Sequence, residues 1–429
     1  MEASAGRTPA SPDRGLRRDA PPSRRGTLSG WLEARAVKAA IRQIEGEELQ
    51  DGVQELRRGV YPDVPYTRDA TWHASVWRWL ARHPSGGEMR RWVAMDGERV
   101  VGHLAATPQS YRVNGQRIVA HTPADYMVHP EYGFQALSLM RRFFRSTENC
   151  VACDMLPAVI AVETRMGAEE AGKLTYRAKL LDVSQLPSPN LEDARKILGR
   201  FLNRGSSGAP EEPPEGPRPE MPPPRPRAPL PAPIKGFLNG GLRAADEALG
   251  RGFGGSLRVE ELDGFDESFD VLFEKIASTV PCLPEKDAAF LNWRYGPGSP
   301  QYPVTVLGVK DPGGQLLGYA VLKVSRNEQD GYPLDLTALP GRPDAARALL
   351  RETTRYFRRQ GVSMIRYRFV DSPTAPRPND LWKLGFFPRN DRSNSLLVKF
   401  ADPTMQETAR RISNWAYNVG DGEATFWLY

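Results

Sequence analysis

The chain has 429 residues, of which 40% are apolar, so two or three domains with cores of ordinary size are expected. The net charge of +6 arises from 58 basic and 52 acidic residues and is therefore mixed in sign. No run of about 18 uninterrupted apolar residues occurs, which argues against a membrane-spanning helix, and three cysteines are few enough to indicate a reducing compartment, so we expect a cytoplasmic protein.

Residues 1–30 form a tail without an expected fold. They contain six arginines and three acidic residues among Pro, Ala, Ser and Gly, and they lack the apolar stretch of a secretory signal. The arginines would suit nucleic-acid binding, but a solvated, disordered tail is the more common meaning of such a composition. We predict no nucleic-acid partner.

Two Asx-Gly pairs divide the next apolar region into strands. Asp96-Gly97 and Asn114-Gly115 each supply the positive φ angles that a two-residue hairpin requires. The strands that they join are Arg91–Met95, Arg99–Val113 and Gln116–Val128. These three runs should form one antiparallel sheet.

The third strand passes into a helix within a few residues. Pro130 lacks an amide hydrogen and ends the ladder, and after Gly133 apolar residues recur at helical spacing. These residues are Phe134, Leu137, Leu139, Met140 and Phe143. The unpaired amides at the start of such a helix, together with its partial positive charge, favour an anion such as a phosphate.

The residues around this junction resemble the GNAT acyltransferases, whose central strand commonly ends in V-x-P-x-Y before a pyrophosphate-binding loop and a helix. Val128, Pro130 and Tyr132 match that ending. The resemblance implies that acetyl-CoA or another acyl-CoA is the co-substrate, with loop amides on its diphosphate and its pantetheine arm paired to the splayed strand. The family's loop reads roughly R/Q-x-x-G-x-G/A, and three or four of its residues, including the basic one, are missing here. The implied acyl-CoA-binding residues are Met127, Val128, Gly133, Phe134, Gln135 and Ala136.

Acyl transfer to an amine requires a base for the amine and stabilisation of the carbonyl oxygen and the departing thiolate. Asp125 and Glu131 are carboxylates near the end of the third strand, and we predict them as candidate catalytic residues. The alternatives are a capping or salt-bridging role for Asp125 and a solvated loop position for Glu131. In many GNAT enzymes a tyrosine on a later helix protonates the thiolate, and the aligned position here is Glu163. The resemblance therefore implies that the usual acid is absent.

Three short segments of this region recur in the same order farther along the chain. The matched pairs are Val100–Leu104 with Leu316–Ala320 at an offset of 216, Ala124–Met127 with Leu334–Thr337 at 210, and Met166–Gly167 with Leu384–Gly385 at 218. These offsets are far longer than a solenoid period, so they predict duplication of a whole domain.

The second copy has a similar pattern when it is taken alone. The predicted elements are strands at Tyr302–Val309, Leu316–Val324 and Leu334–Leu339, a helix from about Pro343 to Gly361, and a strand at Ile365–Phe369. A Gly-rich phosphate loop is lacking here too, and Asp335 is the carboxylate on the central strand. Leu381 occupies the position of the tyrosine that protonates the thiolate in many members of the family.

The segment between the copies differs in composition from both. Residues 205–233 are rich in Pro, Gly, Glu and Arg and should form a semi-extended spacer, with helices predicted at Leu191–Leu202 and Ile234–Leu249.

Cys150 and Cys153 form a C-x-x-C pair in the first copy. Residues three apart on a strand point to opposite faces, so we predict buried cysteines and no metal site.

Together these patterns predict an α+β (mixed α/β) fold with two GNAT-like domains, each a mostly antiparallel sheet flanked by helices. The predicted boundaries are 1–30 for the tail, 31–186 for the first domain, 187–256 for a helical bridge with the Pro-rich linker, and 257–429 for the second domain. The predicted function is acyl transfer from acyl-CoA to a small-molecule or peptidyl amine. Two alternatives stay open: a catalytically degenerate scaffold that binds a protein or glycan partner, and a Fem-like transferase that uses aminoacyl-tRNA.

Overall fold

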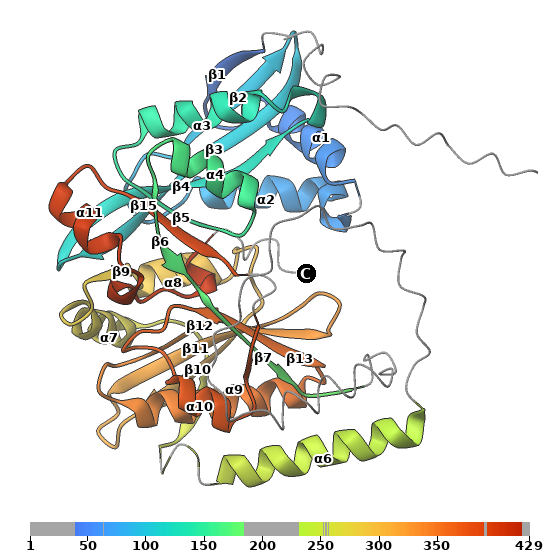
Figure 1. Ribbon diagram of the computed structural model, residues 1–429, viewed down its shortest axis with the longest axis vertical. Helices are drawn as coiled ribbons and strands as arrows, with labels where there is room; N and C mark the ends of the chain where they lie inside the picture. Colours follow the sequence, from blue (N-terminus) through green and yellow to red (C-terminus); the bar gives the residue numbers. More distant parts are fainter. Residues whose placement is uncertain are drawn as a thin grey trace, which may run out of the picture. The chain divides into compact units, whose positions relative to one another are not determined.

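The computed structural model describes residues 39–62, 64–183, 231–251, 253, 255, 257–389 and 393–422. The tail at 1–30, the helix predicted at Leu191–Leu202 and almost all of the Pro-rich segment lie outside the described residues. The described part of the chain contains two β-sheets, each covered by helices (Figure 1). None of the described helices has both the length and the apolar character that crossing a membrane requires.

The first sheet has the strand order β1-β2-β3-β4-β5-β15-β6, and β9 pairs with β3 off this path. Its strands are β1 (Ala40–Ile44), β2 (Arg90–Asp96), β3 (Arg99–Val113), β4 (Gln116–Val128), β5 (Cys150–Asp154), β6 (Glu169–Lys173), β9 (Cys282–Pro284) and β15 (Ser395–Lys399). Its helices are α1 (Gln50–Val60), α2 (Ala70–Leu80), α3 (Gln135–Ser146), α4 (Pro157–Arg165) and α11 (Pro403–Ala409). All strand pairs of this sheet are antiparallel except β4 with β5.

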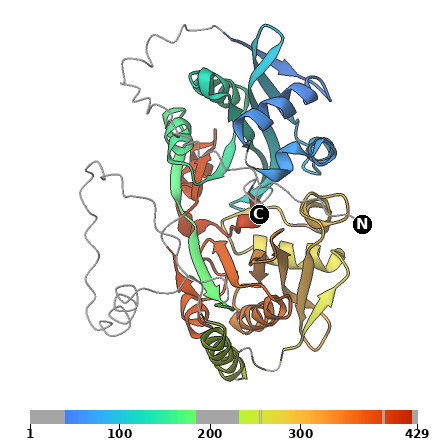
Figure 2. The ribbon, with the colours of Figure 1, turned by 90° about the vertical axis from the view of Figure 1, so that its right-hand side faces the viewer.

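Helices cover the first sheet on both faces (Figure 2). Side chains alternate along β2, so Trp92 and Ala94 pack in one core with Leu139 and Phe143 of α3. Val93 points to the opposite face, where it packs in a second core with residues of α1 and α2. The helix pair α1 and α2 therefore lies across the sheet from α3.

The second sheet has the strand order β14-β7-β13-β12-β11-β10-β8. Its strands are β7 (Thr175–Leu180), β8 (Val259–Leu262), β10 (Thr305–Lys310), β11 (Leu316–Val324), β12 (Asp330–Ala338), β13 (Met364–Phe369) and β14 (Phe387–Pro388). The helices of this part are α6 (Ala232–Arg251), α7 (Glu267–Ala277), α8 (Ala288–Tyr295), α9 (Pro343–Arg359) and α10 (Pro378–Lys383). Ala320 and Leu322 of β11 pack in one core with Leu349 of α9, whereas Tyr319 and Val321 pack in another with residues of α7 and α8.

Both predicted hairpins of the first sheet form, and β3 and β4 have the predicted bounds. Asn114 and Gly115 have φ angles of 50° and 77° and make the two-residue loop that the sequence indicates. The other loop begins one residue later than predicted, because Asp96 still pairs with Arg99 and only Gly97 takes a positive φ. The predicted fold class, two mostly antiparallel sheets flanked by helices, is confirmed.

Each sheet includes a strand that belongs, by chain order, to the other half of the protein. Apart from β9, α6, α11 and the 3-10 helices, the described elements follow the same order in both halves. The first series is β1-α1-α2-β2-β3-β4-α3-β5-α4-β6-β7, and the second is β8-α7-α8-β10-β11-β12-α9-β13-α10-β14-β15. The last strand of each series crosses over, so that β7 lies between β13 and β14 while β15 lies between β5 and β6. The two sheets therefore do not divide at the predicted limits of 31–186 and 257–429.

A reciprocal contact joins α2 to α8, which hold equivalent places in the two series. The Trp79 indole donates to the Trp293 carbonyl at 2.7 Å, and the Trp293 indole donates to the Trp79 carbonyl at 3.1 Å. The two rings are stacked, with centroids 4.1 Å apart and an interplanar angle of 6°. A contact in which each partner uses the same groups is typical of a two-fold arrangement. The separation of 214 residues agrees with the sequence offsets.

Candidate functional site

A cavity opens in the first sheet where β4 and β5 separate. These parallel strands pair only at His121 and Cys150. Beyond that point the Thr122 hydroxyl donates to the Val151 carbonyl at 2.8 Å, and the strands then diverge around a cavity of about 370 Å³. Its walls are Arg57, Tyr61, Val64, Thr122, Pro123, Asp125, Tyr126, Met140, Ala152, Cys153, Asp154, Met155, Leu156, Val159, Glu163 and Asn394.

The cavity is bordered by elements from both faces of the first sheet. Arg57 belongs to α1 on one face, whereas Met140 and Glu163 belong to α3 and α4. Two molecules that approach from opposite faces could therefore meet within the sheet. Most of the lining is apolar, with a few polar groups among it, as is usual for small-molecule sites.

Asp125 lies in the cavity wall, as one of the two predicted catalytic residues, but it is fixed by strong partners. It has a φ of 52°, next to an irregularity in the β3–β4 register. Its carboxylate lies 2.5 Å from Arg57 Nη2 and 3.2 Å from His103 Nδ1. Burial alone would raise the pKa of Asp125, but Arg57 and His103 hold it well below its ordinary value. A carboxylate so stabilised in its charged form is a weak proton acceptor.

Glu131, the other predicted catalytic residue, lies outside the cavity lining. It belongs to the short 3-10 helix η3 (Pro130–Tyr132), its side chain is 77% exposed, and its nearest ionic neighbour is His129 at 3.8 Å. This position matches the solvated loop acid that the sequence left as the alternative.

The predicted acyl-CoA-binding residues also lie outside the cavity lining. Met127 is buried in the core under α1, and its β-pairing partner is His103. Val128 is opposite Gly102 in the β3–β4 ladder, and the amide of the next residue, His129, donates to the Val101 carbonyl. Hydrogen-bonded and non-hydrogen-bonded pairs alternate in an antiparallel ladder, so the backbone groups of Val128 point away from β3.

The start of α3 holds the remaining predicted residues. The Ala136 amide donates to Gly133 at 3.2 Å, so the chain is already coiled at Gly133. Gln135 is buried and its side-chain amide donates to Ala39 at 3.3 Å. Phe134 is the N-cap residue, is 45% exposed, and supplies no side-chain cap. The amides of the first turn are therefore not covered by a capping side chain, which suits an anion.

Glu163 is the residue of this site that the sequence reasoning did not select. It is 1% exposed, and neither of its carboxyl oxygens has a hydrogen-bond partner among the described residues. Burial, and then the charge of Asp154, raises the pKa of Glu163 to about 8. The Tyr126 hydroxyl, also in the lining, is likewise buried and has no hydrogen-bond partner within the part of the chain that the structure describes. At neutral pH the Glu163 carboxyl is therefore largely protonated and can act as a hydrogen-bond or proton donor.

A sequence signal for Glu163 did exist. It is the single charged residue within the run Pro157–Thr164, whose other members are apolar or small apart from the terminal threonine. Glu163 also occupies the position at which the GNAT pattern has the tyrosine that protonates the thiolate. The sequence alone does not say that this side of α4 is covered, so the shift of its pKa was not predictable.

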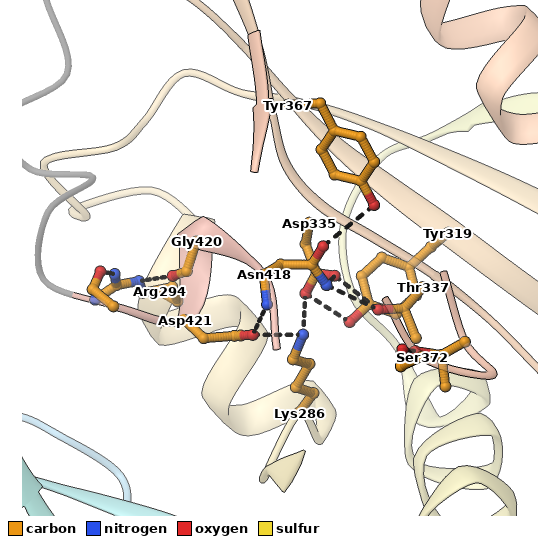
Figure 3. Close-up of polar contacts among 12 residues, drawn as sticks. Lys286, Arg294, Tyr319, Asp335, Thr337, Tyr367, Ser372, Asn418, Gly420 and Asp421 are labelled. Atoms are coloured by element: carbon orange, nitrogen blue, oxygen red, sulfur yellow. Dashed lines mark hydrogen bonds and ion pairs between the residues drawn. The ribbon is translucent and has the colours of Figure 1, made fainter. Parts of the chain in front are cut away.

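The corresponding split in the second sheet is filled. Asp335 of β12 is fully buried and bonded to Lys286 at 2.8 Å, to Thr337 at 2.7 Å and to Asn418 at 2.9 Å (Figure 3). The cavity that borders Lys286 measures about 10 Å³. Asp335 is therefore part of a closed network and is not placed as a base.

Cys150 and Cys153 pack toward opposite faces of the first sheet. Cys150 lies in the core under α3, whereas Cys153 packs against the core that includes Val151 and Leu396. Burial raises the pKa of both thiols. No group of three metal-ligating side chains occurs in the described part of the chain.

Comparison with known proteins identifies a domain that contributes most of the cavity lining. Residues 40–154 match the family described as "Acetyltransferase (GNAT) domain". A probable N-acyltransferase from Enterococcus faecalis V583 is 11% identical, with a TM-score of 0.51 over 86% of this chain and 75% of that one. A GCN5-related N-acetyltransferase from Kribbella flavida is 15% identical, with a TM-score of 0.52 over 87% of this chain and 74% of that one. At these identities the likeness concerns the fold. None of the curated proteins compared with the chain matches its sequence.

Proposed function

We propose that this chain, whose residues 40–154 match the acetyltransferase (GNAT) domain, transfers an acyl group from a CoA thioester to an amine. The observation that carries the proposal is the cavity of about 370 Å³ between β4 and β5. Most of its lining residues lie within the family-matched residues 40–154, and elements on both faces of the sheet border it. The repeated element order and the sequence offsets further lead us to infer a duplicated domain, of which the first copy is the active one.

The residues present fit a thioester arm. The volume lies within the range of about 300–1,000 Å³ that is typical of ligand sites. Beyond His121, β4 has no partner strand on its β5 side among the residues that the structure describes, so this edge can pair with an amide-bearing arm as an added strand would. The backbone of Val128 would hold the arm, and the amides of Phe134 and Gln135 at the N-terminus of α3 would face the diphosphate. Acyl-CoA itself supplies an activated carbonyl with a thiol leaving group.

We assign the proton donor to Glu163. It lies on α4, beyond the split in the sheet, and its carboxyl retains a proton at neutral pH because burial raises its pKa to about 8. A neutral acid at this point can give its proton to the sulfur as the thiolate leaves. Asp125 has a different part: its ion pair with Arg57 fixes the irregular turn of β4 that borders the cavity.

Isothermal titration calorimetry with acetyl-CoA tests the proposal most directly. Wild-type protein should bind acetyl-CoA, and Val159→Trp, which fills the cavity from α4, should lower the affinity at least tenfold. The matched control is Leu137→Trp, on the exposed side of α3 and outside the lining, which should bind as wild type does. Absence of binding by wild-type protein, or equal affinity of both variants, would refute the site.

Glu163→Gln separates binding from chemistry. The variant should retain acetyl-CoA binding while kcat with an accepted amine falls by about 100-fold, since general acid catalysis typically contributes 10²–10⁴. The wild-type rate should also fall as the pH rises through about 8, where Glu163 loses its proton, and this limb should be missing in the variant. An unchanged pH profile would contradict the assignment.

The short connection to α3 favours a second candidate. Only Gly133 and Phe134 separate η3 from α3, so the chain lacks the Gly-rich loop of the GNAT pattern. A Fem-like transferase, which uses aminoacyl-tRNA, would not need that loop. Retention of an aminoacylated RNA by protein that fails to bind acetyl-CoA would support this candidate.

A further inference from the structure

We propose that the split between β12 and β13 of the second sheet, here called the socket, holds the chain's own segment 415–422. We further propose that the held segment positions the wall of the cavity in the first sheet. The inference rests on the proposed function for its catalytic readout alone, because the placement of the segment can be measured separately. It makes Lys286, Asn418 and Gly420 positioning residues for a reaction that takes place in the other half of the protein.

The segment enters the split between β12 and β13. These strands pair in parallel only at Asp330 with Met364 and Gly331 with Ile365. Past that point Asn418 forms an antiparallel bridge with Phe369, and the Val370 amide donates to the Tyr417 carbonyl at 2.7 Å. The place that is hollow in the first sheet is thus occupied by backbone in the second.

Buried charges fasten the segment to the socket (Figure 3). Lys286 lies between Asp335, at 2.8 Å, and Asp421, at 2.9 Å. The Asn418 side chain donates to Asp335 at 2.9 Å, and its backbone amide donates to the Asp421 carboxylate at 2.7 Å. All four residues are at most 6% exposed. Removal of the segment would leave Lys286 and Asp335 buried beside an empty split, which is costly for charged groups.

Gly420 fits the socket because it has no side chain. A Cβ at this position would overlap the Tyr295 hydroxyl and the carbonyl oxygen of Leu334 in β12. The Gly420 carbonyl in turn accepts from Arg294 Nε at 2.9 Å. A single added methyl group is therefore expected to displace the segment without changing any charge.

The far end of the segment lies beside the wall of the cavity in the first sheet. A Cβ added at Gly422 would lie 3.3 Å from the Cβ of Cys153, which lines that cavity. Asp421 borders a small space of about 20 Å³ together with Thr122, which lines the large cavity as well. Thr122 and Cys153 stand on the two strands that diverge, so a shift of the segment would remove support from both sides of the split.

Gly420→Ala in the full chain is the test, and Gly264→Ala is its matched control, because a Cβ at Gly264 meets no atom within 4 Å. Hydrogen exchange should become faster in peptides covering 415–422 and also in those covering 150–156. Calorimetry with acetyl-CoA should show at least a tenfold loss of affinity, and KM for acetyl-CoA should rise more than kcat falls. Gly264→Ala should match wild type in all three measurements.

Faster exchange at 415–422 with unchanged protection at 150–156, and an acetyl-CoA affinity within twofold of wild type, would overturn the inference. If Gly420→Ala does not fold, Asn418→Ala replaces it, since it removes the side-chain bond to Asp335 without adding volume. Wild-type protein that binds no acetyl-CoA would refute the proposed function, while coupled exchange of the two peptides would still support the socket.

Discussion

Replacing Glu163 by glutamine should stabilise the protein in a way that depends on pH. The carboxyl is 1% exposed, and burial, with the charge of Asp154, raises its pKa from an ordinary 4.5 to about 8. Between about pH 4.5 and pH 8 the folded protein therefore holds one proton at Glu163 that the unfolded chain has released. Glutamine has nearly the same size and no titrating group, so it removes this difference.

The sign and size follow from proton linkage. Because the folded state binds one proton more, the free energy of unfolding of wild-type protein falls by about 1.36 kcal/mol per pH unit relative to the variant. The fall begins near pH 4.5 and ends near pH 8, which amounts to about 5 kcal/mol. Below pH 4.5 the difference between the two proteins should be constant, and above pH 8 it should be constant again at its larger value.

Urea unfolding at pH 4.5, 6.5 and 8.5 measures this difference. The advantage of Glu163→Gln should grow with each step, by an order of 2 kcal/mol or more overall even if relaxation halves the shift. Glu131→Gln is the matched control, because that side chain is 77% exposed and its variant should follow wild type at each pH. An advantage for Glu163→Gln that is equal at all three values would refute the protonated, unpartnered state of Glu163 from which its role as an acid is argued.

Three further outcomes are expected. Arg57→Met should lower the free energy of unfolding by about 3–5 kcal/mol in urea, because it leaves the Asp125 carboxylate, which is 11% exposed, without its cation. Adding Asp125→Asn should recover part of this loss, and a loss under about 1 kcal/mol would contradict the ion pair. A double-mutant cycle with Trp79→Ala and Trp293→Ala should give a coupling energy of about 0.5–1.5 kcal/mol for the stacked rings, and additive losses would deny the contact. Calorimetry should give one acetyl-CoA per chain, since the second split is filled, and a stoichiometry of two would argue against the socket.

The sequence predicted best what is decided by neighbouring residues. Asn114-Gly115 determines a tight loop through its own φ angles, and the apolar spacing after Gly133 determines α3, which begins at Gln135. The strand at Cys150 and the helix that begins at Pro343 were found for the same reason. In each case the signal lies within a few residues of the element.

The sequence failed where the deciding partner is remote. The strand β15 pairs with β5 across about 245 residues, and the sequence of neither strand indicates that the other is its partner. Asp125 was selected as a base because of its place on the central strand, but its partner Arg57 is 68 residues away on α1. Glu163 was recognised as a departure from the family pattern and then passed over, since its burial depends on how α4 packs. The choice of catalytic candidates in this fold therefore depends on which buried polar side chains have no partner among the described residues.

The crossing of β7 and β15 bears on how the protein is made. During synthesis from the N-terminus, the first sheet lacks the strand between β5 and β6 until residue 399 has left the ribosome. Until then β5 presents an unsatisfied edge, which is the kind of surface that invites wrong pairing with another chain. Neither half can close by itself, so the two must mature together late in translation, and a nascent chain arrested before β15 should depend on chaperones far more than the released protein does.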